Sequence, residues 1–171
     1  MVTVDGVCLR LHGKTLETLL IRRKSAPHKG KWALPGGFIR MNEPLEKSVI
    51  RELGEETGLR EIAYLTQLGT YGDPKRDPRG RVLTVAFLAL IADDASQLTA
   101  GSDAADAAWY PVEALPEKLA FDHPAIIGDA LRRLLAGART SAVLLPLLPD
   151  PFTEQQAADA LQAVYGVTLD P

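Results

Sequence analysis

Apolar and polar residues alternate along the N-terminal part of the chain. The segment VTVDGVCLRL alternates, breaks at the turn-forming HGKT, and resumes as LETLLIRRK. A period of two is typical of half-buried strands, so this pattern predicts a β-hairpin. The following PHKGKWALPGGF predicts a loop with one brief strand. Further strands are predicted around Ile62–Tyr71, over the apolar run Val82–Ala92, and in the stretch AWYP that precedes a turn.

Two segments carry apolar residues at helical spacing. The first opens at Pro44 and ends at Gly58, which are residue types that suit the start and the stop of a helix. The second is FDHPAIIGDALRRLLAG, with Gly137 as its predicted end. Its apolar stripe consists of Ile126, Ile127, Ala130, Leu131, Leu134 and Leu135. Strands interleaved with two helices predict an α/β protein with a mixed sheet covered on both faces.

The C-terminal part is predicted to be a short helical extension. The proline-rich LLPLLPDP is typical of a connector, and Thr153 with Gln156 forms the capping-box pattern of a third helix, which stops at Gly166. The apolar stripe of this helix comprises Ala157, Ala158, Leu161, Val164 and Tyr165. We therefore expect one domain over residues 1–140. Residues 141–171 form a linker and a packing or oligomerisation helix, which leaves a homodimer open.

Composition narrows the class of protein. With 171 residues and 46% hydrophobic content, the chain can build one domain with a full-sized core. A formal net charge of −3 gives no global sign of nucleic-acid or membrane-surface binding. The one cysteine, Cys8, rules out an internal disulfide and a zinc cluster. We see no signal-peptide pattern and no apolar run long enough to span a bilayer, so we expect a soluble, cytoplasmic protein.

Three glutamates crowd the end of the first predicted helix. Glu52 is three and four residues from Glu55 and Glu56, so these carboxylates share one edge. Each like-charged pair costs roughly 0.2–0.5 kcal/mol, and the negative end of the helix dipole adds a few tenths. Ion pairs with nearby cations would explain one acid at this end of the helix, but they explain three acids poorly. A hard divalent cation such as Mg²⁺ prefers oxygen ligands and commonly bridges carboxylates to phosphates, so the cluster predicts a metal site.

The residues around this cluster follow a specific spacing. Gly37, Glu43 and the run Arg51–Leu59 fill the pattern G-x5-E-x7-R-E-U-x-E-E-x-G-U, in which U is aliphatic. This spacing resembles the Nudix box at every defining position. The preceding GKWALPGGF is also similar to Nudix sequences, and the order of predicted strands and helices fits that fold from residue 2 to residue 138. The resemblance implies a Nudix α/β/α sandwich.

The resemblance also implies a chemistry. Nudix enzymes hydrolyse nucleoside diphosphates linked to another moiety, with Mg²⁺ or Mn²⁺. The implied metal ligands, which are also catalytic, are Glu52, Glu55, Glu56 and the backbone carbonyl of Gly36. One of these glutamates, or an acid on a later loop, would orient or deprotonate the attacking water. Arg51 joins this set because its pairing with Glu43 would hold the loop–helix–loop in shape.

The choice of substrate depends on two further segments. GDPKRDPRGRVLTVAFLAL and LAFDHPAIIGDAL resemble parts of ADP-ribose pyrophosphatases and of Nudix-related transcriptional regulators. ADP-ribose, split to AMP and ribose 5-phosphate, is then the leading substrate, with another dinucleotide or a nucleoside triphosphate as alternatives. The substrate-side candidates are Arg22, Asp77, Arg79 and Arg81. Asp103 and Asp106 are candidates for an additional catalytic acid, although a solvated acidic loop also explains them.

An ADP-ribose-sensing transcriptional regulator, truncated here before its winged helix, is the competing class of function. The segment LPDPFTEQQAADALQAVYGVTLDP resembles the linker and first helix of the DNA-binding appendage in those regulators. The chain ends at Pro171 without a recognition helix and wing, and residues 141–171 carry four acids but no Lys or Arg. We therefore expect a small nucleotide as the partner and no nucleic acid.

Overall fold

The N-terminal hairpin forms as predicted. In the computed structural model, which describes residues 1–95, 97–98, 104–139 and 142–167, β1 (Val2–His12) pairs antiparallel with β2 (Thr15–Arg23). Gly13 makes the turn with a φ of 60°, a conformation that favours glycine. β1 is buried along nearly its whole length because both faces of the sheet are covered around it, whereas the alternation predicts burial of one face only.

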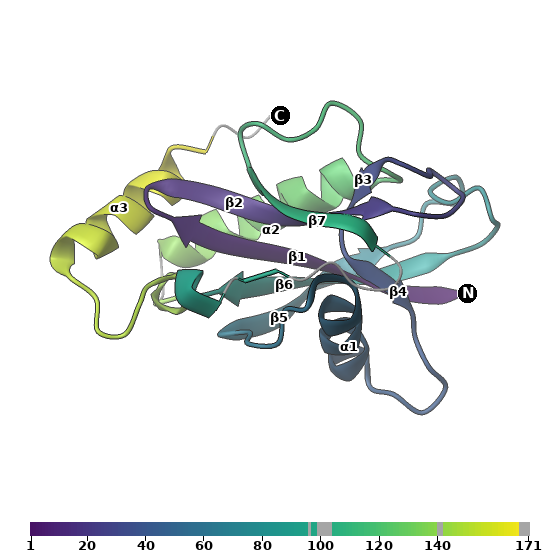
Figure 1. The fold of residues 1–171 in the computed structure, drawn as a ribbon, viewed down its shortest axis with the longest axis horizontal. Coiled ribbons are helices and arrows are strands. Elements are labelled where there is room, and N and C mark those ends of the chain that lie inside the picture. The colour runs from purple at the N-terminus through teal and green to yellow at the C-terminus, as the bar shows by residue number, and fades with distance from the viewer. Residues whose placement is uncertain (96, 99–103, 140–141, 168–171) are drawn as a thin grey trace.

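In the described residues, seven strands form one mixed sheet (Figure 1). After the hairpin come β3 (Trp32–Ala33), β4 (Gly36–Phe38), β5 (Tyr64–Tyr71), β6 (Leu83–Ile91) and β7 (Ala104–Pro111). The strand order is β3-β2-β1-β6-β5, with β4 paired to β1 and β7 paired to β2. β1 and β6 run parallel and the other pairs antiparallel, which confirms the predicted mixed sheet.

β1 changes its partner halfway along its length. Its Thr3–Asp5 part pairs with β4, whereas Leu9–His12 pairs with β2. Between these two parts, the Gly6 N–H donates to the Pro35 carbonyl over 2.9 Å. The segment between β3 and β4 is therefore tied to the middle of β1, and Gly36 follows directly at the start of β4.

Helices cover both faces of the sheet, as expected for an α/β/α sandwich (Figure 1). α1 (Leu45–Thr57) covers one face and buries Val49 and Leu53 there. α2 (His123–Ala138) covers the other face, where its apolar stripe joins the larger core. A Cβ on Gly6 would lie 3.2 Å from Leu53 and 3.3 Å from Val49, so a glycine in β1 lets α1 pack close to the sheet.

Two predicted boundaries are wrong and one is confirmed. Gly137 does not end α2, which continues one residue further; a Cβ at Gly137 would lie 2.9 Å from Val143, so this glycine permits close packing instead. The strand predicted at AWYP begins earlier than expected, because β7 starts at Ala104 and includes Asp106. Gly58 ends α1 in the left-handed conformation, with a φ of 75°.

α3 (Glu154–Tyr165) begins with the predicted capping box. The Gln156 N–H donates to Thr153 Oγ1 over 3.2 Å, and the Thr153 N–H donates to Gln156 Oε1 over 2.8 Å. The helix packs on α2 and β2, where Ala160 and Val164 are buried in the same core as the stripe of α2. The extension therefore packs directly on the sheet-and-helix body.

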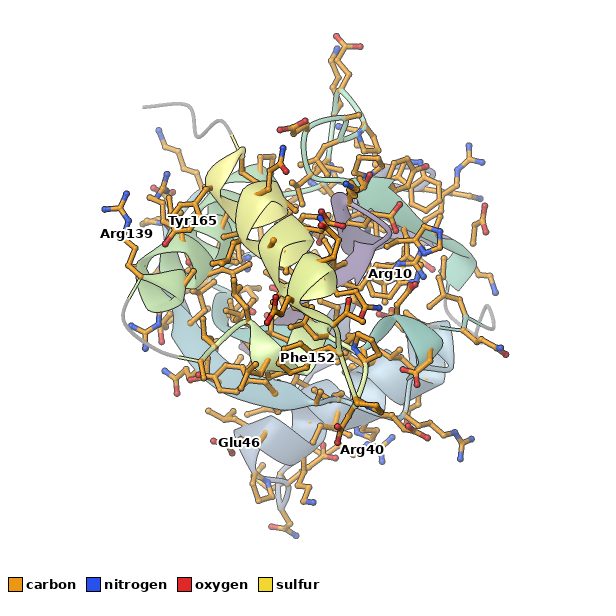
Figure 2. All side chains as sticks on the ribbon, turned by 90° about the vertical axis from the view of Figure 1, so that its left-hand side faces the viewer. Arg10, Arg40, Glu46, Arg139, Phe152 and Tyr165 are labelled. Carbon is orange, nitrogen blue, oxygen red and sulfur yellow. The ribbon has the colours of Figure 1, made fainter. Side chains whose placement is uncertain are left out.

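The buried face of α3 differs from the predicted stripe. Leu161 and Tyr165 belong to that stripe in the sequence pattern, yet they are 41% and 46% exposed. Tyr165 and Phe152 mark the two ends of this helical segment in Figure 2. The part of α3 in contact with the body is instead centred on Ala160 and Val164, because the helix rests on α2 and β2 from one side only. A role in self-association stays a prediction. Among the described residues, no helix combines the length and apolar character needed to cross a membrane.

Candidate active site

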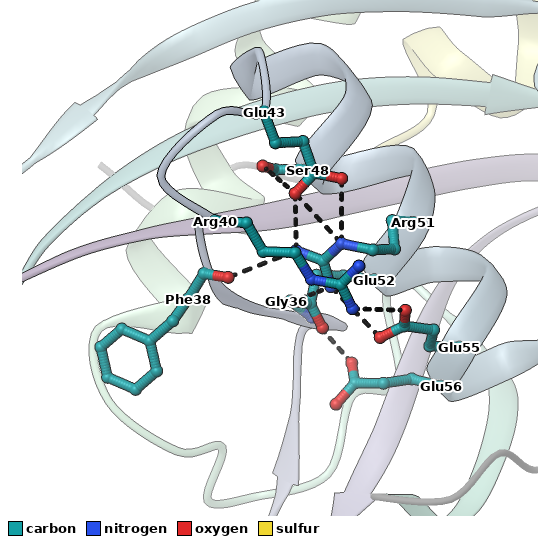
Figure 3. Close-up of polar contacts among 9 residues, drawn as sticks. All are labelled: Gly36, Phe38, Arg40, Glu43, Ser48, Arg51, Glu52, Glu55 and Glu56. Atoms are coloured by element: carbon teal, nitrogen blue, oxygen red, sulfur yellow. Dashed lines mark hydrogen bonds and ion pairs between the residues drawn. The ribbon is translucent and has the colours of Figure 1, made fainter.

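Arg51 is the centre of a charge network on α1 (Figure 3). Its Nε lies 3.0 Å from Glu43 Oε1, its Nη1 lies 2.6 Å from Glu52 Oε1, and the same Nη1 lies 3.2 Å from Glu55 Oε2. Its Nη2 donates to the Phe38 carbonyl over 3.3 Å, which ties the helix to β4. The hydrogen bonds from Arg51 hold the pKa of Glu43 below its ordinary value. One guanidinium thus links the helix, the loop before it and the strand before that loop.

Glu56 lies deepest in the glutamate cluster. It is 8% exposed, and its Oε2 accepts a hydrogen bond from the Gly36 N–H over 2.8 Å. Burial raises the pKa of Glu56 to about 8, an effect that the Gly36 hydrogen bond opposes and that the nearby charge of Glu52 reinforces. Gly36 must be a glycine, because a Cβ there would lie 2.2 Å from the Val4 carbonyl oxygen.

Glu52 packs against the backbone of the next glycine. A Cβ on Gly37 would lie 2.7 Å from the Glu52 carboxyl carbon, so the carboxylate fits only because that atom is missing. Burial raises the pKa of Glu52, although the Arg51 hydrogen bond acts in the opposite direction. The two glycines at the start of β4 therefore bring the backbone into contact with Glu52 and Glu56, the two partly desolvated carboxylates.

The glutamates suit a hard divalent cation in their chemistry. All are oxygen donors, and two of them are buried enough that a bound cation would relieve the cost of desolvated charge. Within the described part of the chain, however, His, Cys, Asp and Glu side chains do not converge in threes as a ready metal site. Glu52 and Glu55 are turned to Arg51, and Glu56 is turned to Gly36. Binding a cation would thus require these side chains to exchange partners.

A charged pocket adjoins the cluster at Gly36. Its lining includes the charged residues Asp5, Arg23, Arg76, Asp77 and Arg79, the backbone of Gly36 and Gly37, and the rings of Phe38, Phe121 and His123. A larger hollow beneath α3 contains none of these residues. The charged pocket is therefore the space in which a substrate could reach the glutamates, because Gly36 belongs to its wall and also contacts Glu56.

Arg79 is fixed on one side of this pocket. Its Nη2 lies 2.6 Å from Asp77 Oδ2, and its guanidinium carbon lies 5.2 Å from the Phe38 ring centroid and 5.7 Å from that of Phe121. Burial alone would raise the pKa of Asp77, but the hydrogen bonds from Arg79 hold it below its ordinary value. Arg23 shares the Phe121 ring at 4.9 Å, and burial together with the charge of Arg79 lowers its pKa. Two guanidiniums beside one ring favour an anion between them.

A buried network connects the two segments that resemble ADP-ribose pyrophosphatases. Arg76, from the first segment, donates to Asp122 of the second over 2.9 Å and 2.7 Å. His123, adjacent to Asp122, accepts a hydrogen bond at Nδ1 from the Leu34 N–H over 2.8 Å, just before β4. Burial lowers the pKa of His123, which keeps the ring neutral. Phe121 precedes them with a φ of 54°, a strained conformation for a phenylalanine.

The structure brings some of the sequence-predicted residues together and leaves others apart. Asp77 and Arg79 line the pocket. Arg22 is exposed and donates to the Gly30 carbonyl over 3.1 Å, while Arg81 donates to the Gly72 carbonyl; neither belongs to the pocket lining. Asp106 lies opposite Arg22 in β7, also outside the lining. Asp103 lies outside the described residues.

Four pocket residues, Asp5, Arg23, Arg76 and His123, are not among the site residues chosen from the sequence, although Arg23 and Arg76 lie in the basic runs RRK (22–24) and KRDPRGR (75–81) that the sequence offers as candidates. Asp5 had a signal, because it is the one charged residue inside an apolar strand pattern, VTVDGV. Arg23 is the neighbour of the chosen Arg22, and a register shift between them in the β2–β7 pairing was not readable from the chain. Arg76 and His123 find their partners 46 and 89 residues away.

Comparisons with known proteins show the family of this chain. The profile of the NUDIX domain matches residues 1–130. The chain is 45% identical over 132 residues to an ADP-ribose pyrophosphatase of Methanocaldococcus jannaschii, which covers 77% of this chain and 73% of that protein. It is 35% identical over 173 residues to the ADPR responsive transcriptional repressor NtrR of Acinetobacter baylyi, which covers 99% of this chain and 68% of that protein.

Solved structures similar to this chain include one with bound ADP ribose and one with bound DNA. Shewanella oneidensis NrtR superposes with a TM-score of 0.87 at 37% identity, over 97% of this chain and 78% of that chain. Its NUDIX domain in complex with ADP ribose gives 0.71 at 36% identity, over 78% of this chain and 88% of that one. The same protein complexed with a 27mer DNA gives 0.85 at 37% identity, over 96% and 76%. These matches confirm the predicted resemblance and the α/β/α fold: the chain belongs to the NUDIX family.

Proposed function

We propose that this chain hydrolyses the pyrophosphate bond of ADP-ribose to AMP and ribose 5-phosphate, with Mg²⁺ or Mn²⁺. The observation that carries the proposal is the position of Gly36, where the carboxylate cluster and the charged pocket meet. Its N–H contacts Glu56 of the carboxylate cluster, and its backbone lines the arginine pocket. A diphosphate lying across this junction would meet the metal-binding carboxylates on one side and guanidiniums on the other.

Glu52, Glu55 and Glu56, with the Gly36 carbonyl, would hold the cation. When bound, such a cation neutralises charge on the diphosphate and polarises its phosphorus–oxygen bonds. Glu56 must lose its proton to act as a ligand, because a carboxylate binds a metal only in the ionised form. Arg51 would keep a positioning role, since it ties Glu52 to the loop before α1.

Arg23 and Arg79 would bind the diphosphate oxygens. Their guanidiniums lie against the Phe121 ring and line the pocket, and the planar fork of arginine suits phosphate oxygens. The ion pair with Asp77 already fixes the Arg79 side chain, so less side-chain entropy is lost when a ligand binds. Arg22 and Arg81, which the sequence also predicts as substrate residues, lie outside the pocket lining, so we assign the diphosphate contacts to Arg23 and Arg79.

The relatives support the choice of substrate. One is an ADP-ribose pyrophosphatase, and the NUDIX domain of another has been solved with ADP ribose. Both segments that suggest ADP-ribose in the sequence meet at the pocket, through Arg79 and Phe121. The pocket thus combines a diphosphate-binding chemistry with the parts of the chain that resemble ADP-ribose enzymes.

A product assay tests the proposal. The wild type is incubated with Mg²⁺ or Mn²⁺ and with ADP-ribose, NADH, sugar nucleotides or nucleoside triphosphates, and AMP or nucleoside monophosphate release is quantified by chromatography. We expect the highest kcat/KM for ADP-ribose and a loss of at least about a hundredfold in kcat for Glu56→Gln. A wild type that prefers a triphosphate would remove ADP-ribose as the substrate, and near-normal turnover of Glu56→Gln would remove the metal assignment.

The arginine assignment has a matched control within β2. Arg23→Ala and Arg79→Ala should each raise KM for ADP-ribose by roughly 10- to 100-fold, which corresponds to about 1.5–3 kcal/mol for a charge-assisted hydrogen bond. Arg22→Ala removes an exposed arginine from outside the pocket and should change KM less than about threefold. Equal effects of Arg22→Ala and Arg23→Ala would contradict the assignment.

An ADP-ribose-responsive regulator is the second candidate. The similarity to the repressor extends over 99% of this chain and so includes α3. Residues 141–171 nevertheless carry no Lys or Arg, which disfavours phosphate binding by this segment. We expect the 171-residue chain to turn over ADP-ribose and to show no salt-sensitive, sequence-specific binding in a duplex DNA mobility-shift assay. Duplex binding that ADP-ribose weakens would favour the regulator.

A further inference from the structure

Asp5 places a carboxylate at the bottom of the charged pocket. It lies in β1 directly opposite Gly36 of β4, and it is 7% exposed. A Cβ on Gly36 would lie 2.7 Å from Asp5 Oδ1, so the carboxylate reaches the backbone that also contacts Glu56. Asp5 is part of the pocket lining, so what remains exposed of it faces the same space as Arg23 and Arg79.

The Asp5 carboxylate lacks a hydrogen-bond donor among the described residues. Its nearest cation is Arg76, with Nη2 3.7 Å from Oδ2, and His123 Nε2 is 3.8 Å from Oδ1. Both distances exceed the usual hydrogen-bond range. Arg76 is already bonded to Asp122 through two nitrogens. His123 accepts the Leu34 N–H at Nδ1, so its own ring hydrogen is on Nε2, which is too far from Asp5 Oδ1 for a hydrogen bond. A buried carboxylate with unfilled acceptor sites carries a desolvation cost that a ligand donor would remove.

The charges around Asp5 indicate which donor fits. A phosphate group on a ligand is negatively charged near neutral pH and would be repelled by the carboxylate. A sugar presents several neutral hydroxyls, each able to donate to a carboxylate oxygen. Arg23 and Arg79, which line the same pocket, offer the donors that phosphate oxygens need. The pocket lining therefore holds donors for phosphate oxygens and, in Asp5, an acceptor that suits a hydroxyl.

We infer that Asp5 is a specificity-determining residue, whose carboxylate accepts hydrogen bonds from the hydroxyls of the sugar beyond the diphosphate. This inference rests on the proposed function. A nucleoside diphosphate linked to a sugar places hydroxyls beside Asp5, whereas a nucleoside triphosphate places its terminal phosphate there. Asp5 thus favours the first class by hydrogen bonding and disfavours the second by charge repulsion.

A purely structural role for Asp5 makes a different prediction. If Asp5 served only as a counter-charge for Arg76, its removal would loosen the pocket and weaken all substrates alike. Asp122 is the matched control for this case, because it is the nearer partner of Arg76, at 2.7 Å, and is not part of the pocket lining. Asp122→Asn should therefore reproduce the structural effect without altering the preference among substrates.

The test compares Asp5→Asn, Asp122→Asn and wild type with ADP-ribose and ATP as substrates. We expect Asp5→Asn to lower the ratio of kcat/KM for ADP-ribose to kcat/KM for ATP by roughly 10- to 100-fold, and Asp122→Asn to leave that ratio within about threefold. Circular dichroism checks folding, and Asp5→Ser, with a smaller neutral side chain, replaces Asp5→Asn if the latter does not fold. An unchanged ratio in the Asp5 variant would overturn the inference.

A binding experiment separates this inference from the proposed function. Calorimetry in the presence of EDTA gives the Kd of ADP-ribose and of ADP, which lacks the second sugar. The wild type should bind ADP-ribose more tightly than ADP. In Asp5→Asn the ratio of the Kd of ADP to the Kd of ADP-ribose should fall at least about tenfold. A wild type that shows the difference but hydrolyses no ADP-ribose would refute the proposed hydrolysis and retain the sugar contact. Equal binding of both ligands by the wild type would refute the contact.

Discussion

Replacing Glu56 by glutamine should stabilise the metal-free protein, and the gain should grow with pH. Burial raises the pKa of Glu56 from the ordinary 4.5 to about 8, so the folded protein holds this proton more tightly than the unfolded chain does. A group of this kind contributes stability below the unfolded pKa, and the contribution is lost as pH rises to the folded pKa. Glutamine keeps an oxygen that can accept the Gly36 N–H but carries no charge at any pH.

The magnitude follows from the two pKa values. Each pKa unit corresponds to 1.36 kcal/mol, so the charge on Glu56 should cost the folded state roughly 5 kcal/mol once the pH exceeds 8. Roughly 1.5 kcal/mol of this is already lost at pH 5.5. The difference in unfolding free energy between Glu56→Gln and wild type should therefore increase by roughly 3 kcal/mol between pH 5.5 and pH 9.

The assay is urea denaturation in EDTA at both pH values, followed by circular dichroism. Glu55→Gln is the matched control, because the Glu55 side chain is 47% exposed and water solvates its charge; its effect should stay within about 0.5 kcal/mol at both pH values. If the difference between Glu56→Gln and wild type is the same at pH 5.5 and pH 9, the buried charge does not destabilise the fold and the reasoning is refuted.

Three further predictions concern the framework around the site. Gly37→Ala should weaken Mn²⁺ binding at least about tenfold in an EPR titration, because the new Cβ would lie 2.7 Å from the Glu52 carboxyl carbon; unchanged binding would contradict this contact. Arg76→Met should lower the urea unfolding free energy by roughly 3–5 kcal/mol by leaving the buried Asp5 and the partly buried Asp122 without their cation, and a loss below about 1 kcal/mol would argue against the network. Val164→Ala should cost about 2 kcal/mol and Leu161→Ala less than about 0.5 kcal/mol, and the reverse order would contradict the docking of α3.

The glutamate cluster was predictable because its determinants are local. Helical periodicity places Glu52, Glu55 and Glu56 on one edge whatever the rest of the chain does, and Gly58 ends the helix through its own backbone conformation. The hairpin and the capping box of α3 also depend on short-range patterns, whereas the parallel pairing of β1 with β6 joins residues about 80 positions apart. The spacing of the Nudix box therefore gave the family and the carboxylates directly.

The pocket beside the cluster was decided by tertiary structure. Whether Arg22 or Arg23 enters it depends on strand pairing, where a register shift between the two residues changes which side each one faces. Whether Arg76 binds substrate or forms a buried structural ion pair depends on Asp122, which is 46 residues away in the sequence.

The role of Asp5 follows from the same distant pairings. The chain shows one acid in an apolar strand, and only the assembled sheet places that acid opposite Gly36. Burial on both faces of β1 leaves the Asp5 residue only 7% exposed, and its nearest cationic and imidazole nitrogens, on Arg76 and His123, lie 3.7 Å and 3.8 Å away, beyond hydrogen-bond range. Periodicity fixes which residues share a face of one element, whereas desolvation and pairing depend on what the other elements bring to that face.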